Sequence, residues 1–432
     1  MKIFIVCPRL CHGGAERVAV SLANGFVQRG HEVLFFADLY EEQTYMLDGM
    51  VQVMNLVPQT NNKLKKWGGA ISLLRKQLKK DKPDVIIGIM SLCSIVAELA
   101  SIGMGIPVVA TEHDPYERPD SSPMPILIKF YKFWLSRRMF TCVTVLTEAD
   151  KKVLGKRLCN ATVMANPLAL EPIETLSPRK RIILASGRVD NWHYKGFDVL
   201  IRAWGRVNGQ LKIDNGKLSS NGEPWKLVIA GVWRNPETRT YLDGIAKECG
   251  VKDKIEYIGF VSDMQKLYAE SSIFVLSSRY EAFGLVLIEA MSQGCACVAC
   301  DYKGRQREIL NPTLTLPEGE GESPLESQSL GTGNLNLDAL PQRTLLEQSG
   351  EKTRNLKPET RNLPVELCET GILCEPDDVE ALAEAMKKMI EDDEYRESVR
   401  AKAIERSKYY SIENTMNRWE ALLKQVTGVK QL

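Results

Sequence analysis

Residues 272–301 read SIFVLSSRYEAFGLVLIEAMSQGCACVACD and contain two short apolar runs on either side of a helical segment. Residues 272–278 have the β-branched and aromatic composition of a strand. A loop over 279–284 leads into an apolar helical segment that ends at Gly294, a residue type that commonly terminates helices. A second strand follows at 296–301. Strand, helix and strand in this order predict a βαβ unit of a parallel sheet.

The same alternation extends through the rest of the chain. The expected strands are 2–8, 32–37, 84–90, 107–113 and 142–147 in the first half, and 181–188, 225–231, 254–260, 272–278, 296–301 and 371–376 in the second. Helical patterns lie between them, near 14–29, 66–80, 92–103, 124–138, 196–206, 236–249, 284–293 and 377–391. This number of strands exceeds one open sheet, so we expect an α/β fold with two doubly wound, Rossmann-like domains facing a cleft.

A proline-rich stretch with little periodicity, residues 166–180, separates the two halves. We therefore expect an N-terminal domain at 1–172 and a C-terminal domain at 173–410. Residues 411–432 form a further helix, which we expect to cross back to the N-terminal domain. Residues 311–367 contain no aromatic residue and are rich in Gly, Ser, Glu and Pro, a composition that predicts a disordered insertion.

The composition excludes several classes of protein. Net charge is +1 over 432 residues, which gives no indication of nucleic-acid binding. No apolar stretch reaches the roughly 18 residues of a membrane span, and the 11 cysteines lack a disulfide spacing, so we expect a cytoplasmic protein. Cys295, Cys297 and Cys300 have no histidine nearby, and we expect no metal site there.

Four loops at the carboxyl ends of expected strands carry candidate functional residues, because ligand sites of such folds form at that edge. Gly13 and Gly14 precede a helix and offer amides to an anion, or else form only a tight turn. His113 lies where a strand ends, and either acts in the site or caps the next helix. Arg188 follows a strand and Lys195 precedes a helix, so they form either a diphosphate clamp or ordinary surface charge.

The fourth loop belongs to the βαβ unit described first. Glu281 lies in the loop and Glu289 within the helix, with the amides of Phe283, Gly284 and Leu285 expected in the first turn. Carboxylates accept hydrogen bonds from hydroxyls, whereas amides and cations bind phosphates. A nucleotide sugar offers both kinds of group. The alternative for Glu289 is a buried salt bridge, with Arg188 as the candidate partner.

At these residues the chain resembles the retaining glycosyltransferases of family four, which have the GT-B fold. Glu281 and Glu289 match the Glu-x7-Glu motif, and Gly187, Arg188, Lys195 and Gly196 match the GR…KG element. Gly13–Gly14 match the GG loop, and Gly259–Phe260 lie upstream of the Glu-x7-Glu motif as expected. Glu308 and Ile309 also match a Glu-Ile pair, although KGRQ replaces the preceding Gly-Pro turn. The GGAERV segment looks most like members that build bacterial polysaccharides or lipid-linked oligosaccharides.

The resemblance implies a role for each matched residue. Arg188 and Lys195 would hold the donor diphosphate, Glu281 would contact the donor sugar, and His113 would lie near the reacting centre. Glu289 would bind the ribose. The remaining donor-binding residues implied are Gly13, Gly14, Gly259, Phe260, Val261, Phe283, Gly284 and Leu285. No Asp-x-Asp pair is present, so we expect a metal-independent hexosyltransferase that uses a UDP-linked sugar as substrate and needs no cofactor.

Two basic, apolar segments suggest where the acceptor binds. Residues 63–82 carry eight Lys/Arg and one Asp, and residues 125–140 carry four cations among aromatic side chains. Residues 1–172 hold 21 Lys/Arg and 16 Asp/Glu, a net charge of 21 − 16 = +5. We therefore expect contact with the inner leaflet of a membrane and a glycan or lipid-diphosphate saccharide as acceptor. The alternative is that the apolar faces pack on the sheet while the lysines are solvated.

Two other functions are compatible with the same sequence features. A nucleotide-sugar epimerase or a sugar phosphorylase also uses two doubly wound domains around a cleft. A binding protein without turnover would retain the same contacts to a nucleotide sugar. Transfer to an acceptor, epimerisation of the donor alone, and binding without product distinguish these functions.

Overall fold

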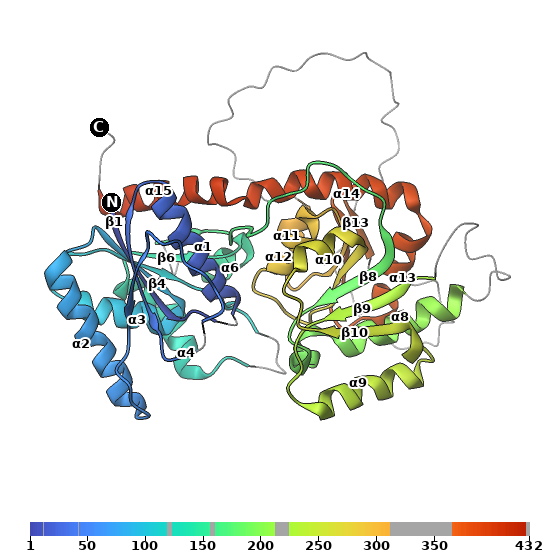
Figure 1. Ribbon diagram of the computed structural model, residues 1–432, viewed down its shortest axis with the longest axis horizontal. Helices are drawn as coiled ribbons and strands as arrows, with labels where there is room; N and C mark the ends of the chain where they lie inside the picture. Colours follow the sequence, from blue (N-terminus) through green and yellow to red (C-terminus); the bar gives the residue numbers. More distant parts are fainter. Residues whose placement is uncertain are drawn as a thin grey trace, which may run out of the picture.

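The structure is a computed structural model that describes residues 1–11, 13–41, 43–118, 123–155, 160–211, 224–311 and 365–428. Two seven-stranded sheets lie side by side with their helices around them (Figure 1). The sequence-based expectation of an α/β fold with two doubly wound domains is confirmed.

The N-terminal sheet has the order β3-β2-β1-β4-β5-β6-β7, and all its strand pairs are parallel. Helices cover both faces, and the inner strands are apolar on both sides as this burial requires. The strands are β1 (Lys2–Arg9), β2 (Glu32–Asp38), β3 (Gln52–Asn55), β4 (Val85–Ile89), β5 (Val108–Thr111), β6 (Cys142–Val145) and β7 (Ala161–Val163). The helices are α1 (Gly14–Gln28), α2 (Lys63–Asp81), α3 (Met90–Ser101), α4 (Ile126–Phe130), the π-helical turn η1 (Tyr131–Leu135), α5 (Ser136–Met139) and α6 (Glu148–Leu154).

The C-terminal sheet has the order β10-β9-β8-β11-β12-β14-β13, and only the edge strand β13 is antiparallel to its neighbour. The strands are β8 (Lys180–Ser186), β9 (Lys226–Ala230), β10 (Ile255–Gly259), β11 (Ser271–Leu276), β12 (Ala296–Cys300), β13 (Val365–Cys368) and β14 (Gly371–Cys374). The helices before β13 are η3 (Val189–Asn191), α7 (Trp192–Lys195), α8 (Phe197–Leu211), α9 (Pro236–Glu248), η4 (Lys252–Lys254), α10 (Met264–Glu270), α11 (Leu285–Ser292) and α12 (Arg305–Leu310).

The end of the chain is helical and spans both domains. After β14 come α13 (Val379–Glu391), α14 (Asp393–Ser407), η6 (Lys408–Tyr410) and α15 (Ile412–Thr427). Figure 1 shows α14 beside the C-terminal sheet and α15 beside α1 of the other domain. Met416, Trp419 and Leu423 of α15 join the core formed by β1 and α1, because its apolar residues recur at helical spacing.

The end of the expected insertion and three short edge strands differ from the expected organisation. Residues 365–367 of the expected insertion belong to β13, whereas 312–364 lie outside the described residues. Three strands, β3, β7 and β13, carry no recognisable pattern in the sequence. Each is three or four residues long and lies at a sheet edge, where a continuous apolar run is not required.

Buried polar contacts join the two domains away from the sheets. Arg305 of α12 and Asp150 of α6 form an ion pair, with 2.6 Å between Nη2 and Oδ1, and both side chains are fully or almost fully buried. The Glu308 carboxylate accepts hydrogen bonds from the backbone N–H groups of Glu148 (2.8 Å) and Ala149 (2.6 Å). Glu308 therefore satisfies amides at the start of an α-helix that belongs to the other domain. Among the described residues, we find no helix with both the length and the hydropathy of a membrane span.

Candidate functional site

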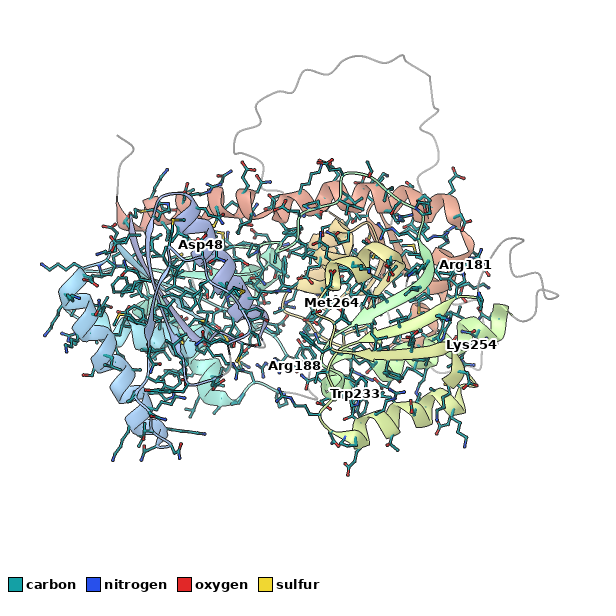
Figure 2. All side chains as sticks on the ribbon, in the orientation of Figure 1. Asp48, Arg181, Arg188, Trp233, Lys254 and Met264 are labelled. Carbon is teal, nitrogen blue, oxygen red and sulfur yellow. The ribbon has the colours of Figure 1, made fainter. Side chains whose placement is uncertain are left out.

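The carboxyl ends of β8 and β11 bring three of the predicted charged residues to the side of the C-terminal domain that faces the N-terminal domain. Arg188 follows β8 directly and is exposed, and Figure 2 shows it between the two domains. Gly231, at the end of β9, packs so closely on the backbone of Gly187 that a Cβ there would lie 1.7 Å from the Gly187 carbonyl oxygen. This close packing holds the loop that presents Arg188.

Lys195 and Glu281 meet directly. Lys195 ends α7, and its Nζ lies 2.5 Å from Glu281 Oε1. Ser278 Oγ donates a hydrogen bond to the same carboxylate (3.0 Å), and Tyr194 Oη lies 3.4 Å from its other oxygen. Gly196 makes this geometry accessible, since its φ is +64° and a Cβ would lie 1.9 Å from the Ser277 carbonyl oxygen. Lys195 lies just before the helix α8, as expected, and it also ends the short helix α7.

Glu289 is buried on α11 and is paired across the domains. Its carboxylate forms an ion pair with Arg17 of α1 and accepts a hydrogen bond from Tyr268 Oη (3.3 Å). Burial raises the pKa of Glu289, and the charge of Arg17 partly opposes that shift. The buried salt bridge considered for Glu289 therefore exists, but its partner is Arg17 and not Arg188.

The first turn of α11 begins later than the sequence suggests. The helix starts at Leu285, and Gly284 is its N-cap with φ of +100°. Phe283 precedes the cap and is buried, so Phe283 and Gly284 are not part of the first turn. Leu285 reaches the other domain, because a Cβ on Gly14 would lie 3.2 Å from its side chain. Gly13 is the N-cap of α1, and Gly14 is its first residue.

The loop after β10 lies beside the loop that presents Arg188. Gly259 ends β10 with φ of +70°, and its carbonyl oxygen accepts a hydrogen bond from Gly231 N (2.7 Å). Phe260 is 76% exposed, which is unusual for a large apolar side chain, whereas Val261 is half-buried. An exposed aromatic ring at this position offers a flat surface for a planar ligand group.

His113 lies on the N-terminal side, at the carboxyl end of β5. Thr111 Oγ1 donates to the Gly88 carbonyl oxygen, so it accepts a hydrogen bond from His113 Nε2 (3.1 Å). Burial lowers the pKa of His113 to about 4, and the ring is therefore neutral at neutral pH. The charge of Asp114 opposes this shift of the pKa, whereas the charge of Lys132 adds to it. No hydrogen bond reaches Nδ1 from the described residues.

A cavity of about 740 Å³ opens beside His113 in the N-terminal domain. Its polar side contains His113, Asp114 and a buried ion pair between Lys132 and Glu112, whose Nζ and Oε2 atoms lie 3.0 Å apart. Leu127 and Ile128 of α4 line its apolar side and remain exposed. The cavity thus combines a polar floor with an apolar rim.

Several side chains of this region could not be recognised as functional from the sequence. Arg17 stands one helical turn after Gly13–Gly14, a spacing that places it at the same helix end as the glycines. Tyr194 contacts Glu281 and Tyr268 contacts Glu289. Aromatic residues in the loops and short helices of an α/β fold do not by themselves indicate a functional site. The ion pair between Lys132 and Glu112 could not be predicted either, because neither their spacing nor the local composition indicates that the two residues meet.

Comparisons with known proteins identify the family. The model described as Glycosyltransferase Family 4 matches residues 12–170, and the model described as Glycosyl transferases group 1 matches residues 170–316. The chain belongs to the family-four glycosyltransferases of GT-B type. Together the two matches span residues 12–316, the part of the chain in which the candidate site residues lie.

Individual relatives agree with this assignment. An uncharacterized glycosyltransferase of Haemophilus influenzae is 28% identical over 295 residues, which are 66% of this chain and 76% of the relative. A Campylobacter jejuni enzyme is 25% identical over 72% of this chain and 82% of its own length. Its name describes an α-1,4-N-acetyl-D-galactosaminyltransferase and a saccharide linked to PP-undecaprenol.

Solved structures share the fold at low sequence identity. HepE of Anabaena, determined with UDP and glucose, matches with a TM-score of 0.68 and 16% identity over 98% of this chain and 100% of its own. Sucrose-phosphate synthase of Thermosynechococcus elongatus matches with a TM-score of 0.70 and 16% identity over 99% of this chain and 100% of its own. These glycosyltransferase neighbours confirm the GT-B fold.

Proposed function

We propose that this glycosyltransferase moves a hexosyl group from a nucleotide-diphosphate sugar, UDP-linked, to a lipid-linked saccharide or glycan, with retention of configuration. The observation that carries this proposal is the contact between Lys195 and Glu281 beside the exposed Arg188. A phosphate-binding cation and a hydroxyl-binding carboxylate adjoin each other there, as diphosphate and sugar adjoin in a sugar nucleotide.

Each group has a defined part in donor binding. Arg188 and Lys195 neutralise the diphosphate, and Glu281 accepts hydrogen bonds from donor-sugar hydroxyls. Phe260 stacks on the base, with Gly259 and Val261 beside it, while Gly13, Gly14 and the segment 283–285 approach the phosphates and the sugar. Glu289 accepts hydrogen bonds from the ribose, for which Arg17 must move away from that carboxylate.

The reaction proceeds on one face of the donor sugar. The bond between the anomeric carbon and the diphosphate oxygen breaks, and the acceptor oxygen bonds to the same face. The acceptor proton passes to the departing diphosphate. Arg188 and Lys195 stabilise the charge on the leaving group, which makes the transfer metal-independent. Neutral His113 accepts a hydrogen bond at Nδ1 from a sugar hydroxyl and so orients the reacting groups.

The acceptor binds in the N-terminal cavity. A saccharide suits the polar floor around His113, and the apolar rim on α4 suits a lipid. Ile126, Phe130 and Trp134 continue that exposed apolar surface along α4 and η1. The basic face of α2 adds positive charge, since Ala70, Leu74 and Leu78 face the core and most of its lysines face solvent. We infer peripheral contact with an anionic leaflet on the cytoplasmic side of a membrane.

The central experiment measures donor binding and then transfer. UDP-, GDP- and ADP-sugars are screened by thermal shift, because binding to the native state raises the melting temperature. The selected donor is incubated with membrane lipid extract, and nucleotide release and product are measured with and without EDTA. We expect transfer that survives EDTA. Loss with EDTA that Mg²⁺ restores would exclude the cation-clamp mechanism, and epimerised donor without transfer would identify an epimerase.

A vesicle assay tests the membrane part separately. The protein should sediment with vesicles that contain about 30% phosphatidylserine, whose negative surface imitates an anionic leaflet. It should not sediment with neutral phosphatidylcholine vesicles. Replacing Leu127 and Trp134 with serine should reduce sedimentation at least threefold. Equal sedimentation of this variant and the unmodified protein would exclude α4 and η1 as the contact surface.

A further inference from the structure

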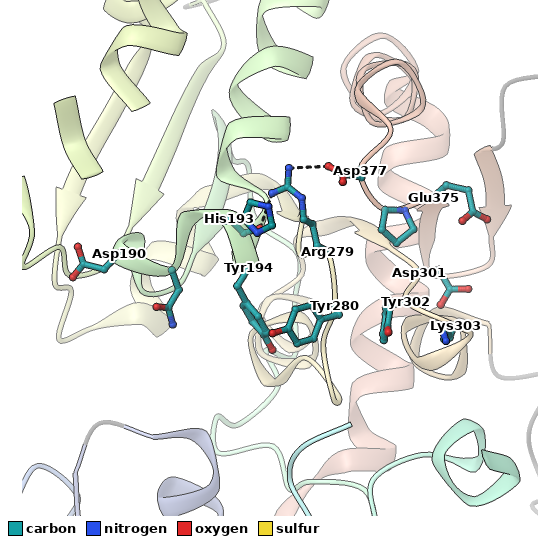
Figure 3. A pocket seen from close by; sticks show the side chains of 12 residues that line it. Asp190, His193, Tyr194, Arg279, Tyr280, Asp301, Tyr302, Lys303, Glu375 and Asp377 are labelled. Atoms are coloured by element: carbon teal, nitrogen blue, oxygen red, sulfur yellow. Dashed lines mark hydrogen bonds and ion pairs between the residues drawn. The ribbon is translucent and has the colours of Figure 1, made fainter. Parts of the chain in front are cut away.

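A second cavity opens at the carboxyl edge of the C-terminal sheet, and the proposed donor contacts do not use it. We call it the side pocket; its volume is about 630 Å³ (Figure 3). Its walls come from α7 and from the loops that follow β11, β12 and β14. His193 and Tyr194 stand on one side, Tyr302 and Lys303 on the other, and Tyr280 between them.

An ion-pair network on Arg279 fixes the shape of the side pocket. Its guanidinium makes two hydrogen bonds of 2.8 Å to Asp198 of α8 and one ion pair of 2.8 Å to Asp377 after β14. It also donates to the His193 carbonyl oxygen (2.6 Å). These contacts tie α7, α8 and the loop after β14 to one side chain, so the walls are pre-formed. They also neutralise the charge of Arg279 inside the structure.

The charges of the side pocket do not suit a phosphate. Asp190, Asp301, Glu375 and Asp377 line it, while Lys303 is paired with Glu117 of the N-terminal domain at 3.2 Å. The positive charges of the lining are thus matched by carboxylates, and Asp301 is in turn paired with Arg307 outside the pocket at 3.1 Å. The lining itself carries more carboxylates than cations. A ligand that donates hydrogen bonds from uncharged groups fits this lining, whereas a diphosphate is repelled.

Three tyrosines give the side pocket aromatic walls. The rings of Tyr194 and Tyr280 lie 4.3 Å apart at 77°, and those of Tyr280 and Tyr302 lie 5.9 Å apart at 56°. Aromatic faces bind the apolar C–H face of a pyranose, and carboxylates bind its hydroxyls. Aromatic rings and carboxylates together therefore indicate an uncharged saccharide, and the volume is within the range of ligand pockets.

The side pocket adjoins both parts of the proposed active site. Tyr194 Oη is 3.4 Å from Glu281, and burial followed by the Glu281 charge raises the pKa of Tyr194. On the opposite wall, Lys303 is paired with Glu117 (3.2 Å), which lies between Asp114 and Arg118 of the N-terminal cavity. A ligand in the side pocket would thus lie next to the donor sugar and next to the acceptor cavity.

We propose that the side pocket binds an uncharged sugar unit of the acceptor, next to the unit that receives the new glycosidic bond. This inference rests on the proposed function and adds that the acceptor is at least a disaccharide. The donor nucleotide and its diphosphate bind elsewhere, at Arg188, Lys195 and Glu289.

Two variants and a control test the side pocket. Tyr280→Ala removes the central ring, Glu375→Ala removes an exposed carboxylate, and Glu391→Ala removes an exposed carboxylate at the end of α13, outside the pocket. The probes are α- and β-linked disaccharides of glucose, galactose, N-acetylglucosamine and N-acetylgalactosamine. Binding is followed by saturation-transfer difference NMR with UDP present, and melting temperatures check that each variant folds.

We expect at least one disaccharide to bind the unmodified protein and Glu391→Ala equally, and both pocket variants at least tenfold more weakly. The dissociation constant of UDP should change less than twofold. Unchanged disaccharide binding in both pocket variants, or no disaccharide binding by a protein that binds UDP, would overturn the inference. Failure to bind any nucleotide would instead overturn the proposed function.

A transfer assay separates an acceptor from a regulatory saccharide. The disaccharide that binds is incubated with the sugar nucleotides, and the product is analysed by mass spectrometry. A trisaccharide product is expected and identifies the bound sugar as acceptor. Binding without a product from any donor would overturn the acceptor assignment.

Discussion

Lys195 and Glu281 are the pair of side chains on which the proposed chemistry depends most. Both are largely shielded from solvent, and each neutralises the other. In the proposed mechanism, a bound donor would offer both groups new partners, because diphosphate attracts the ammonium and sugar hydroxyls donate to the carboxylate. The proposal thus predicts that donor binding exchanges this ion pair for contacts to the diphosphate and the sugar.

Substituting either member of this pair should nearly abolish transfer while the protein remains folded. Lys195→Ala and Glu281→Gln are each expected to lower turnover about a hundredfold, or roughly 3 kcal/mol of transition-state stabilisation. Lys247→Ala and Glu256→Gln, which change exposed residues of the same domain, serve as matched controls. If both site variants turn over nearly as fast as the unmodified protein, Lys195 and Glu281 are not part of the active site.

His113 predicts a pH dependence of stability. Its pKa is about 4 in the folded chain and 6.5 in the unfolded chain, so the unfolded state binds the proton first as pH falls. The stabilisation is complete above pH 6.5 and is lost progressively between pH 6.5 and 4. At pH 5 the loss is at most about 2 kcal/mol.

The measurement compares the unmodified protein with His113→Gln. Melting temperatures are recorded from pH 7.5 to 5, and the unmodified protein should lose more stability than the variant. Parallel curves would show that His113 is protonated equally in both states. Because the ring stays neutral, transfer itself should not decline at pH 6 through protonation of His113.

The strand β13 begins at Val365, inside the insertion that the composition predicts for residues 311–367. Val365–Cys368 pairs with β14, and Arg307 of α12 holds it through an ion pair with Glu366. The composition of residues 312–364 still predicts a segment that contributes no core. The boundary at residue 367, chosen from composition, cuts through a strand.

Replacing residues 312–364 with a short Gly/Ser linker should leave folding and UDP binding unchanged. Loop closure depends weakly on length, at about 0.6 kcal/mol per doubling, so α12 and β13 should dock with either connection. Replacing 311–367 is the matched comparison, because it also removes most of β13, and it should lower the melting temperature. Unfolding of the shorter deletion would show that 312–364 is an integral part of the domain.

At the scale of the whole molecule, polar contacts link the domains near α6 and α12. The Asp150 carboxylate accepts hydrogen bonds from Arg305, from the backbone N–H of Tyr116 (3.0 Å) and from the Thr147 hydroxyl (2.9 Å). A carboxylate so enclosed depends on its partners, because an unpaired charge in a buried position is costly. The relative placement of the two domains is thus fixed by a satisfied buried network.

Asp150→Asn should destabilise the protein by about 3–5 kcal/mol, the typical cost of leaving one member of a buried ion pair without its partner. Glu405→Gln removes one member of an exposed ion pair, with Lys408, and should change stability by less than about 1 kcal/mol. Urea midpoints of the two variants and the unmodified protein provide the comparison. Equal midpoints would mean that the Arg305–Asp150 contact does not stabilise the assembled domains.

The sequence alone determined the two sheets, most of their inner strands, and the loops that carry Arg188, Lys195 and Glu281. These features follow from local patterns: apolar runs specify buried strands, helical spacing specifies packed faces, and strand ends specify the ligand edge. The edge strands β3, β7 and β13 are not recognisable, because a short strand at a sheet edge needs no continuous apolar run, whereas the edge strand β10 is apolar enough to be expected. The amphipathic spacing of α15 likewise showed that one of its faces is buried.

Only the tertiary structure decided which residues meet. Arg17 and Glu289 are 272 positions apart, and Asp150 and Arg305 are 155 apart, yet each pair is in contact across the domains. The side pocket similarly requires four separate segments of the C-terminal domain, which follow β8, β11, β12 and β14. The periodicity of apolar residues predicts that a side chain is buried, but it does not predict which residues that side chain contacts. Contacts between residues distant in the chain depend on how whole domains pack.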